Sequence, residues 1–348
     1  MRHSPVVLRR AGLVLLAAAL AACAARAETP LPKLNIDPTR VGVAGLSSGA
    51  YMATQTQLAW PRAFVGAALV AGGPYGCADG KLETALGACM KGEPPIDVDV
   101  LVARAHKRAS EGLIGPLEAL AKARVYVLHG KLDGLVAAPV AQASATFYER
   151  LRAATPALSG MQVEYDGERA FAHNLPVVQK GDDCEKSTSP YLGHCGFDAA
   201  AEIFAHLFGA APHAVSAASG ELRTFAQKPF LSEGKDAFLA DSGYAYLPQA
   251  CLKGQRCGLM IVFHGCKQNA QAVGEAFVRD AGFNRWADAY DVAVIYPQTR
   301  SSLMPLNPQA CWDWWGYSGA DYDTRNGVQQ QWLHRLLRAL AVVPDGAN

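Results

Sequence analysis

The sequence predicts an α/β fold in which a mostly parallel sheet is covered by helices on both faces. Short apolar runs typical of buried strands alternate with longer stretches typical of helices. Half of the 348 residues are hydrophobic and only 18% are charged, which provides a large core and excludes a disordered chain. No repeat of roughly 20–50 residues and no low-complexity linker divides the sequence, so we expect a single domain over residues 28–348.

The first expected strand, residues 41–44, is apolar and runs directly into Gly45-Leu46-Ser47-Ser48-Gly49, after which residues 50–60 are typical of a helix. Six further short runs of apolar or alternating aromatic residues predict strands: 65–70, 125–128, 162–165, 244–247, 259–263 and 292–296. Longer stretches between them predict helices: 98–123 with a break near Gly112 and Gly115, 141–152, 199–207, 283–290 and 327–342. Residues 77–95 are expected to form a loop.

The N-terminus has the pattern of an export signal. Three arginines within the first ten residues precede an uncharged run that ends at Arg26 and is too short to span a bilayer comfortably. Two endings fit the pattern. Cleavage after Ala27 removes residues 1–27, whereas Leu20-Ala21-Ala22-Cys23 resembles a lipobox that would place a lipid anchor on Cys23. We therefore expect a secreted or periplasmic protein, with a membrane attachment only if Cys23 is lipidated.

Charge and cysteine content narrow the classes of partner. The whole chain has a net charge of +1 and no long basic run, which argues against a nucleic-acid partner.

Eight cysteines follow the signal, an even number that suits four disulfides in an oxidising compartment. Sequence proximity favours Cys77–Cys89, Cys184–Cys195 and Cys251–Cys257, which leaves Cys266–Cys311. Without a C-x-x-C or H-E-x-x-H pattern, we expect no metal site.

The segment 45–49 is a G-x-S-x-G motif between an expected strand and an expected helix, the context of a nucleophile elbow. Glycines suit the sharp, crowded turn. The serine is exposed at the carboxyl end of a strand, where the following helix N-terminus favours developing negative charge. We therefore assign Ser47 as a candidate nucleophile.

A serine nucleophile needs a base, and the base needs an orienting carboxylate. In hydrolases with this layout the chain order is serine, acid, histidine. Asp133 follows the strand at 125–128 and fits the acid. Asp166 also follows a strand, but it precedes the expected base by only a few residues. Among the histidines, His173 follows the strand at 162–165 and has the right place in this order, whereas His129 and His264 precede glycines at strand ends and suit turns.

The oxyanion hole combines the amide after the nucleophile with one from an H-G-type loop. The candidates are the N–H groups of Ser48 and of Cys266, which follows His264-Gly265. This loop normally precedes the nucleophile in the chain, whereas here it follows by more than two hundred residues. A circular permutation explains the order without a change of chemistry.

Several motifs in combination resemble those of extracellular polyhydroxybutyrate (PHB) depolymerases, in particular the circularly permuted, single-domain fungal type. They are GLSSGAYM at 45–52, AGGPYGC at 71–77, STSPY at 187–191, HGCKQ at 264–268, YPQ at 296–298 and CWDW at 311–314. The resemblance covers nearly all of residues 35–340. It departs at residues 78–123, which look longer and more helical than the family pattern and could reshape the cleft.

The resemblance implies an α/β-hydrolase fold and a serine esterase that hydrolyses poly(3-hydroxybutyrate) or a related short-chain polyester as a monomer, without cofactor or metal. It implies Ser47, Asp133 and His173 as the triad, with the Ser48 and Cys266 amides as the oxyanion hole, and it supports the four cysteine pairs. Cys311 to Tyr317 contains three tryptophans and a tyrosine, and large aromatic faces suit an apolar polyester. We name Trp312 and Trp314 as candidate substrate contacts, and Tyr75 as a third.

Three other functions remain open from the sequence. The first is hydrolysis of soluble hydroxyalkanoate oligomers, because nothing separates polymer from oligomer or fixes the chain length. The second is a feruloyl or acetyl xylan-type carbohydrate esterase, which shares the H-G-C loop. The third is a non-catalytic binding protein, against which the intact triad argues. No separate granule-binding domain is visible, so adsorption to solid polymer would depend on apolar residues at the surface of the one domain.

Overall fold

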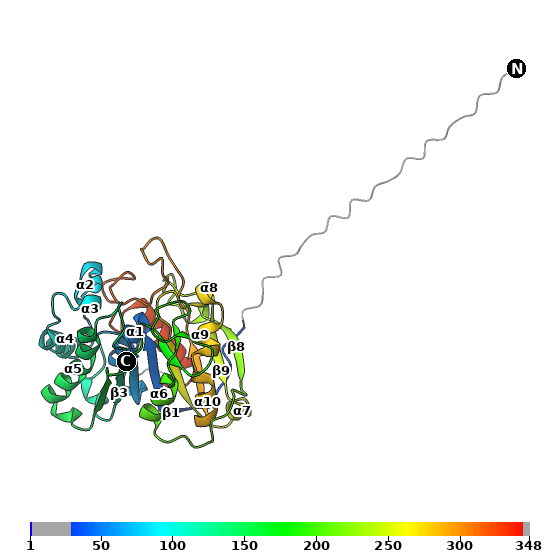
Figure 1. Cartoon of the computed structure of the whole chain (residues 1–348), viewed down its shortest axis with the longest axis horizontal. Helices are drawn as coiled ribbons and strands as arrows, with labels where there is room; N and C mark the ends of the chain where they lie inside the picture. Colours follow the sequence, from blue (N-terminus) through cyan, green and yellow to red (C-terminus); the bar gives the residue numbers. More distant parts are fainter. Residues whose placement is uncertain (2–28, 344–348) are drawn as a thin grey trace.

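One eight-stranded sheet runs through the middle of the computed structural model (Figure 1). The structure describes residue 1 and residues 29–343, so the rest of the expected export signal, including Cys23, lies outside the described residues. The strands lie in the order β4-β3-β2-β1-β10-β11-β9-β8, parallel from β4 to β11, while β9 and β8 are antiparallel to their neighbours. Their bounds are β1 Ile36–Leu46, β2 Gly66–Val70, β3 Arg124–Leu128, β4 Gln162–Asp166, β8 Glu221–Ala226, β9 Ser242–Leu247, β10 Cys257–Phe263 and β11 Val292–Tyr296.

A small three-stranded sheet and a set of helices complete the fold. The small sheet has the order β5-β7-β6, with β5 Leu175–Val177, β6 Asp182–Asp183 and β7 Leu192–His194. The helices are α1 Ser48–Ala59, α2 Leu82–Leu86, α3 Ala88–Lys91, α4 Val98–Ser110, α5 Ala138–Ala154, α6 Ala199–Phe208, α7 Gln249–Leu252, α8 Ala270–Val273, α9 Ala276–Asp280, α10 Phe283–Tyr290 and α11 Val328–Ala339. Single 3-10 turns occupy Pro61–Ala63, Leu117–Leu120, Pro156–Leu158 and Lys228–Phe230.

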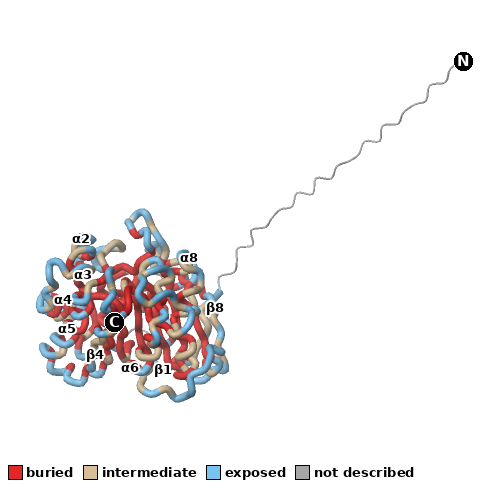
Figure 2. The backbone as a smooth tube through the Cα atoms, in the orientation of Figure 1, coloured by how far each residue is buried: buried red, intermediate tan, exposed pale blue. Residues whose placement is uncertain are grey.

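The central strands are apolar throughout because both of their faces are covered. Every residue of β10 is buried, and Figure 2 shows the buried backbone concentrated in the middle of the molecule. Successive strand residues point to opposite faces. In β10, Leu259 and Ile261 pack into the same core cluster as α1, α5 and α11, whereas Met260 and Val262 pack with α6, α9 and α10. The predicted α/β architecture, with helices on both faces, is therefore confirmed.

Several stretches differ from the sequence prediction. The expected loop 77–95 contains the short helices α2 and α3, and the expected helix 98–123 ends as α4 at Ser110, with a 3-10 turn further on. Strands β5 to β8 and the short helices α7, α8 and α9 were not expected from the sequence. Helices of four or five residues are too short to show a helical period, and the outer strand β8 alternates charged and apolar residues without a continuous apolar run.

The sheet places the beginning and the later part of the chain side by side. Strand β1 lies between β2 and β10, and Val43 is directly opposite Ile261. The strand that precedes the G-x-S-x-G motif is therefore adjacent to the strand that precedes the H-G-C loop. Because both strands are parallel, their carboxyl ends meet at one edge of the sheet. Circular permutation stays an interpretation of this chain order.

Candidate active site

Ser47 occupies a sharp turn between the end of β1 and the start of α1. Its φ of 57° lies in the left-handed region, and its backbone N–H donates to the Val70 carbonyl at 2.8 Å. A Cβ at Gly45 would lie 2.1 Å from the Gly49 oxygen, and a Cβ at Gly49 would lie 2.2 Å from the Phe263 oxygen. Both glycines of the motif are therefore required by the close approach of backbone to backbone, as expected for a strained elbow that exposes its serine.

Asp133 and His173 form a directly bonded pair. His173 Nδ1 lies 2.7 Å from Asp133 Oδ2, and since a carboxylate only accepts, the ring donates from Nδ1. The other oxygen, Asp133 Oδ1, accepts the N–H groups of Leu135 at 2.8 Å and Val136 at 2.9 Å. Burial by itself would raise the pKa of Asp133, but the hydrogen bonds from His173 and these two amides hold its pKa below the usual value.

The rival acid, Asp166, is engaged elsewhere. Its carboxylate lies 2.8 Å from Arg169 at the end of β4 and has no contact with His173 among the described residues. A second histidine, His129, instead lies next to Asp133. Its Nε2 is 2.9 Å from the Val136 carbonyl and 3.6 Å from Asp133 Oδ2, so it must carry the proton. His129 therefore supports the turn after β3, as the sequence indicated.

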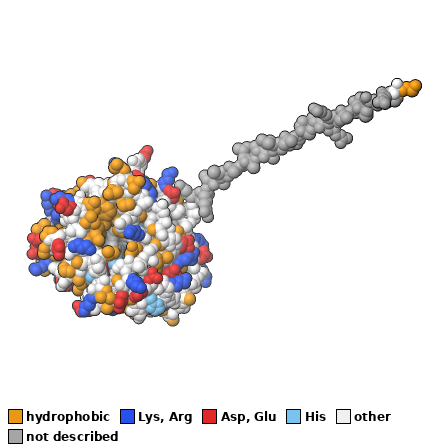
Figure 3. Space-filling view, turned by 45° about the horizontal axis from the view of Figure 1, so that its top comes forward, with side chains coloured by type: hydrophobic (Ala, Val, Ile, Leu, Met, Phe, Trp, Pro, Cys, Tyr) orange, Lys and Arg blue, Asp and Glu red, His pale blue; other side chains and the backbone are white. Residues whose placement is uncertain are grey.

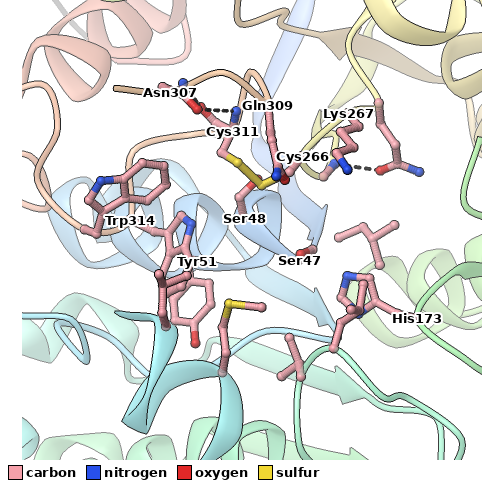
Figure 4. Close-up of a pocket in the computed structure, with 18 of the residues that line it drawn as sticks. Ser47, Ser48, Tyr51, His173, Cys266, Lys267, Asn307, Gln309, Cys311 and Trp314 are labelled. Carbon is pink, nitrogen blue, oxygen red and sulfur yellow. Dashed lines mark hydrogen bonds between the residues drawn. A yellow bond between two sulfur atoms is a disulfide. The ribbon is translucent and has the colours of Figure 1, made fainter. Parts of the chain in front are cut away.

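The H-G-C loop lies against the nucleophile. A Cβ built on Gly265 would be 3.4 Å from Ser47 Cβ, and the Gly265 N–H is held at 2.7 Å by Gln268 Oε1. Within the described part of the chain, neither Ser48 nor Cys266 donates its backbone N–H to another group. Two free amides therefore flank the serine, and Figure 4 shows Ser47, Ser48 and Cys266 close together at the pocket.

His264 is fully buried beneath this loop. Burial lowers its pKa to about 4, so the ring is neutral above that pH. Nδ1 donates to the Gly265 carbonyl at 2.7 Å, and Nε2 accepts from the N–H of Thr299 at 3.3 Å, while the Thr299 hydroxyl donates to the Ala310 carbonyl at 2.6 Å. A neutral imidazole with one donor and one acceptor fits these partners, so His264 fixes the loop without taking part in proton transfer.

A pocket of about 570 Å³ opens beside Ser47 and His173. Its floor and walls are mainly apolar, and Figure 3 shows hydrophobic side chains gathered on the face that is turned forward. The apolar lining side chains are Leu46, Leu82, Leu86, Met90, Leu135, Val136, Leu306, Pro308, Trp314 and Trp315. Leu82 and Leu86 belong to α2, so the unexpected helices of residues 82–91 form one wall of the pocket.

The structure corrects two of the three aromatic predictions. Trp314 lines the pocket and stacks on Tyr51, with ring centroids 4.6 Å apart. Trp312, in contrast, is fully buried against Phe263 with centroids 4.7 Å apart, and it does not reach the pocket. Tyr75 is also buried away from the pocket and donates to the Asp323 carbonyl at 3.0 Å. Both side chains fill the core because their neighbours in space come from the sheet and from α5.

Sequence reasoning missed most of the other lining residues. Trp315, which the aromatic run between Cys311 and Tyr317 already indicated, lines the pocket beside Trp314, whereas Leu306, which the sequence did not single out, reaches the pocket from the loop before Cys311. These residues lie in loops or in very short helices, where no period distinguishes a pocket side chain from a buried one. The only signal was the local density of aromatic residues between Cys311 and Tyr317.

All four predicted cysteine pairs are present as disulfides: Cys77–Cys89, Cys184–Cys195, Cys251–Cys257 and Cys266–Cys311. The last one ties the H-G-C loop to the aromatic segment that carries Trp314. Across residues 29–343, no group of three or more His, Cys, Asp or Glu side chains could hold a metal ion. Within the same residues no helix is both long and apolar enough to cross a membrane.

Curated relatives match nearly the whole chain. A family model described as esterase, PHB depolymerase, matches residues 242–330. The polyhydroxybutyrate depolymerase of Talaromyces funiculosus is 32% identical over 87% of this chain and 90% of its own length. This chain belongs to the PHB depolymerase family. The poly(3-hydroxybutyrate) depolymerase of Delftia acidovorans is 37% identical over 90% of this chain, which spans 62% of that protein's length.

Solved structures of the family agree with the fold. The PHB depolymerase from Penicillium funiculosum has a TM-score of 0.76 at 28% identity, with 91% of this chain and 100% of that chain covered. A serine-to-alanine variant of a PHB depolymerase complexed with an R3HB trimer has a TM-score of 0.79 at the same identity and coverage. The α/β-hydrolase fold expected from the sequence is therefore confirmed.

Proposed function

We propose that this chain is an exported serine esterase that hydrolyses poly(3-hydroxybutyrate) or a related short-chain polyester. The observation that carries the proposal is the arrangement around Ser47. A half-buried serine on a strained turn, a carboxylate-bound histidine and two free amides border one apolar pocket. Family membership makes a polyester the first substrate class to test.

In the proposed mechanism His173 is the general base. Because Nδ1 donates to Asp133, the neutral ring presents Nε2 as its acceptor, which takes the proton of Ser47 as the serine attacks an ester carbonyl. Asp133 fixes the tautomer and stabilises the imidazolium that forms. The buried carboxylate needs no proton for this role, since its own hydrogen bonds favour the charged form.

The tetrahedral oxyanion is bound by the N–H groups of Ser48 and Cys266. Each donor of this kind contributes about 3 kcal/mol of transition-state stabilisation in measured cases. The alcohol fragment then leaves with the proton held by His173, and an acyl group remains on Ser47. Water, activated by the same histidine, releases the acid and restores the serine. The steps use no metal ion and no cofactor.

The pocket supports an apolar acyl chain as substrate. Leucine, methionine and tryptophan side chains provide most of its wall, which suits the methyl-bearing backbone of a hydroxybutyrate polymer better than the hydroxyl groups of a sugar ester. Leu303, Met304 and Leu306 project from the surface beside it, being 82%, 91% and 58% exposed. An apolar rim of this kind supports adsorption to solid polymer by the catalytic domain itself.

We infer export from the N-terminal pattern and the four disulfides, with residues 28–348 as a single catalytic domain that acts as a monomer. Cleavage after Ala27 and lipidation of Cys23 remain alternative fates of the signal. Circular permutation of the hydrolase order accounts for a nucleophile strand that comes first in the chain and lies in the middle of the sheet.

The direct test is the clearing of an amorphous poly(3-hydroxybutyrate) suspension by the purified protein and its Ser47→Ala variant. A short p-nitrophenyl ester is assayed in parallel. We expect wild type to act on both substrates and the variant to lose at least about a thousandfold in kcat, since it retains only binding and the oxyanion donors.

Cleavage of the small ester without release of hydroxybutyrate products would keep the esterase and exclude the polyester. If the Ser47→Ala variant retained both activities, Ser47 would be excluded as the nucleophile. Circular dichroism of the variant serves as the control for folding.

A further inference from the structure

The pocket beside Ser47 contains one cationic side chain in an otherwise uncharged wall. Among the described residues that line it, none is acidic, and Lys267 is the only lysine or arginine. Its exposed side chain takes part in no ion pair with any described residue. Because no acidic side chain of residues 29–343 lines the pocket and no ion pair with those residues holds Lys267, its charge is available to a ligand in the pocket.

The backbone of Lys267 is fixed directly beside a proposed oxyanion donor. Its N–H donates to the Gln309 carbonyl at 2.7 Å, and the preceding residue, Cys266, is bonded to Cys311. The following residue, Gln268, is held through its side chain, which donates to the Pro190 carbonyl at 2.8 Å. Figure 4 shows Lys267 next to Cys266 on this loop. The backbone that carries the charged Lys267 side chain is therefore held in place on both sides.

Lys267 also occupies a costly conformation for its residue type. Its φ of 61° lies in the left-handed region, where glycine is the residue that avoids strain. The bonds on both sides hold this backbone geometry, so the lysine side chain is not needed to maintain it. The side chain is thus present at a position where the backbone alone would favour glycine.

A lysine stem reaches about 6 Å from its Cα. From a residue adjacent to Cys266, this reach covers groups within about one repeat unit of an ester bound at Ser47. Polyester in the bulk of a granule presents only neutral esters there. A short hydroxy-acid oligomer presents a carboxylate at its end, which an unpaired ammonium in an apolar pocket attracts.

We propose that Lys267 binds the terminal carboxylate of a short hydroxyalkanoate oligomer, so that the enzyme favours soluble, acid-ended oligomers over the same oligomers with a blocked end. This inference rests on the proposed function and refines its substrate class. It assigns a specificity role to Lys267, whereas the triad and the oxyanion donors act on either substrate.

The test compares kcat/KM for the linear trimer of 3-hydroxybutyrate with that for its methyl ester. The proteins are wild type, Lys267→Met and Lys267→Arg. We expect wild type to prefer the acid, and the ratio of acid to ester to fall about fivefold in Lys267→Met, the size of a partly exposed ion pair. Lys267→Arg keeps the charge and should keep most of the ratio. High salt should reduce the preference of wild type, because it screens an exposed charge.

The matched control is Lys253→Met, which removes a lysine from the exposed turn after α7, outside the pocket. It should leave the acid-to-ester ratio unchanged. An equal ratio in wild type and Lys267→Met overturns the role of Lys267 while trimer hydrolysis itself upholds the esterase. Failure of wild type to cleave either trimer, with cleavage of a p-nitrophenyl ester, overturns the polyester function and the inference together.

Discussion

The two oxygens of Asp133 have separate tasks. Oδ1 accepts the amides of Leu135 and Val136 and thereby closes the loop after β3, while Oδ2 accepts the ring N–H of His173. A carboxylate fixed on one side by the backbone cannot rotate away from its histidine on the other side. The orientation of the His173 ring is therefore set by a local turn rather than by distant packing.

This division predicts the behaviour of Asp133→Asn. The amide oxygen can still accept the two loop N–H groups, but the amide nitrogen then faces His173 and forces the other tautomer. We expect kcat/KM to fall about 10⁴-fold, as for the equivalent change in a well-studied serine protease, with little change in the free energy of unfolding. The measurement is hydrolysis of a p-nitrophenyl ester together with urea denaturation.

Asp166→Asn is the matched control because Asp166 pairs with Arg169 and not with the base. It should retain activity within about twofold, as is typical of a surface ion pair that is removed. Similar losses in both variants would contradict the assignment of the acid.

At this scale the sequence predicted that Asp133 and His173 lie together beside the pocket that contains Ser47, but it did not predict which aromatic residues reach that pocket. Chain order and strand ends were sufficient for Ser47, Asp133 and His173, because the fold fixes which loops meet. Trp312 and Trp314 are two residues apart in an irregular loop, and no period shows which one faces the core. Their difference comes from contacts with Phe263 and Tyr51, which are remote in the sequence.

Among the elements, the aromatic segment is organised by a single buried carboxylate. Asp313 Oδ1 accepts the N–H groups of Trp315, Gly316 and Tyr317 at 3.2, 2.6 and 3.0 Å, and Oδ2 accepts that of Ser318 at 2.7 Å. These bonds coil the chain tightly around Asp313. These bonds provide partners for four backbone N–H groups within one loop, as a helix or a sheet would do.

Burial nevertheless raises the pKa of Asp313 to about 6, against the bonds that favour its charged form. In the unfolded chain an aspartate titrates near pH 3.9. Between these values the folded state binds more protons than the unfolded state, so the free energy of unfolding falls as pH rises from about 4 to about 6. Over these two pH units the expected decrease in the free energy of unfolding is about 3 kcal/mol.

Urea unfolding at pH 4, 5 and 6 would measure this effect, with Asp313→Asn as the variant that cannot titrate. We expect the stability of wild type relative to the variant to fall over this interval, and to level off above it. A constant difference between the two proteins across the interval would show that Asp313 keeps an ordinary pKa.

The sequence predicted helices and strands correctly where apolar residues form a continuous run or recur at a regular spacing. The sequence predicted strands β10 and β11 because each is a continuous apolar run. It predicted helix α10 because apolar residues recur there at helical spacing. Helices α2 and α3 were missed because their few residues are shaped by the Cys77–Cys89 bond and by the hydrogen bond from Tyr51 to the Cys89 carbonyl at 2.5 Å. Such tertiary restraints leave no local pattern.

On the scale of the whole molecule, the disulfides differ in what they join. Cys251–Cys257 closes a loop of 6 residues at the amino end of β10, whereas Cys266–Cys311 spans 45 residues and connects two walls of the pocket. Both restrict the unfolded chain, but only the second one also restrains groups next to Ser47.

Removing each pair by double Cys→Ser substitution should separate these effects. The chain-entropy relation predicts a loss in the free energy of unfolding of about 2 kcal/mol for the Cys251–Cys257 variant and about 4 kcal/mol for the Cys266–Cys311 variant. We expect kcat to fall in the second variant alone. Guanidinium denaturation and ester hydrolysis at a temperature where both variants are folded provide the measurement, and an equal effect on kcat would contradict the restraining role.

The pairing of β1 with β10 has a consequence for when the enzyme becomes active. Val43 and Ile261 lie opposite one another although most of the chain separates them. Pairing at such a distance requires the closure of a long loop and forms slowly. The serine is therefore synthesised early, while the amide of Cys266 that completes its site is synthesised late. A nascent chain that ends before β10 carries Ser47 without Cys266, so in the proposed mechanism hydrolysis begins only after roughly three quarters of the polypeptide has been added and has folded.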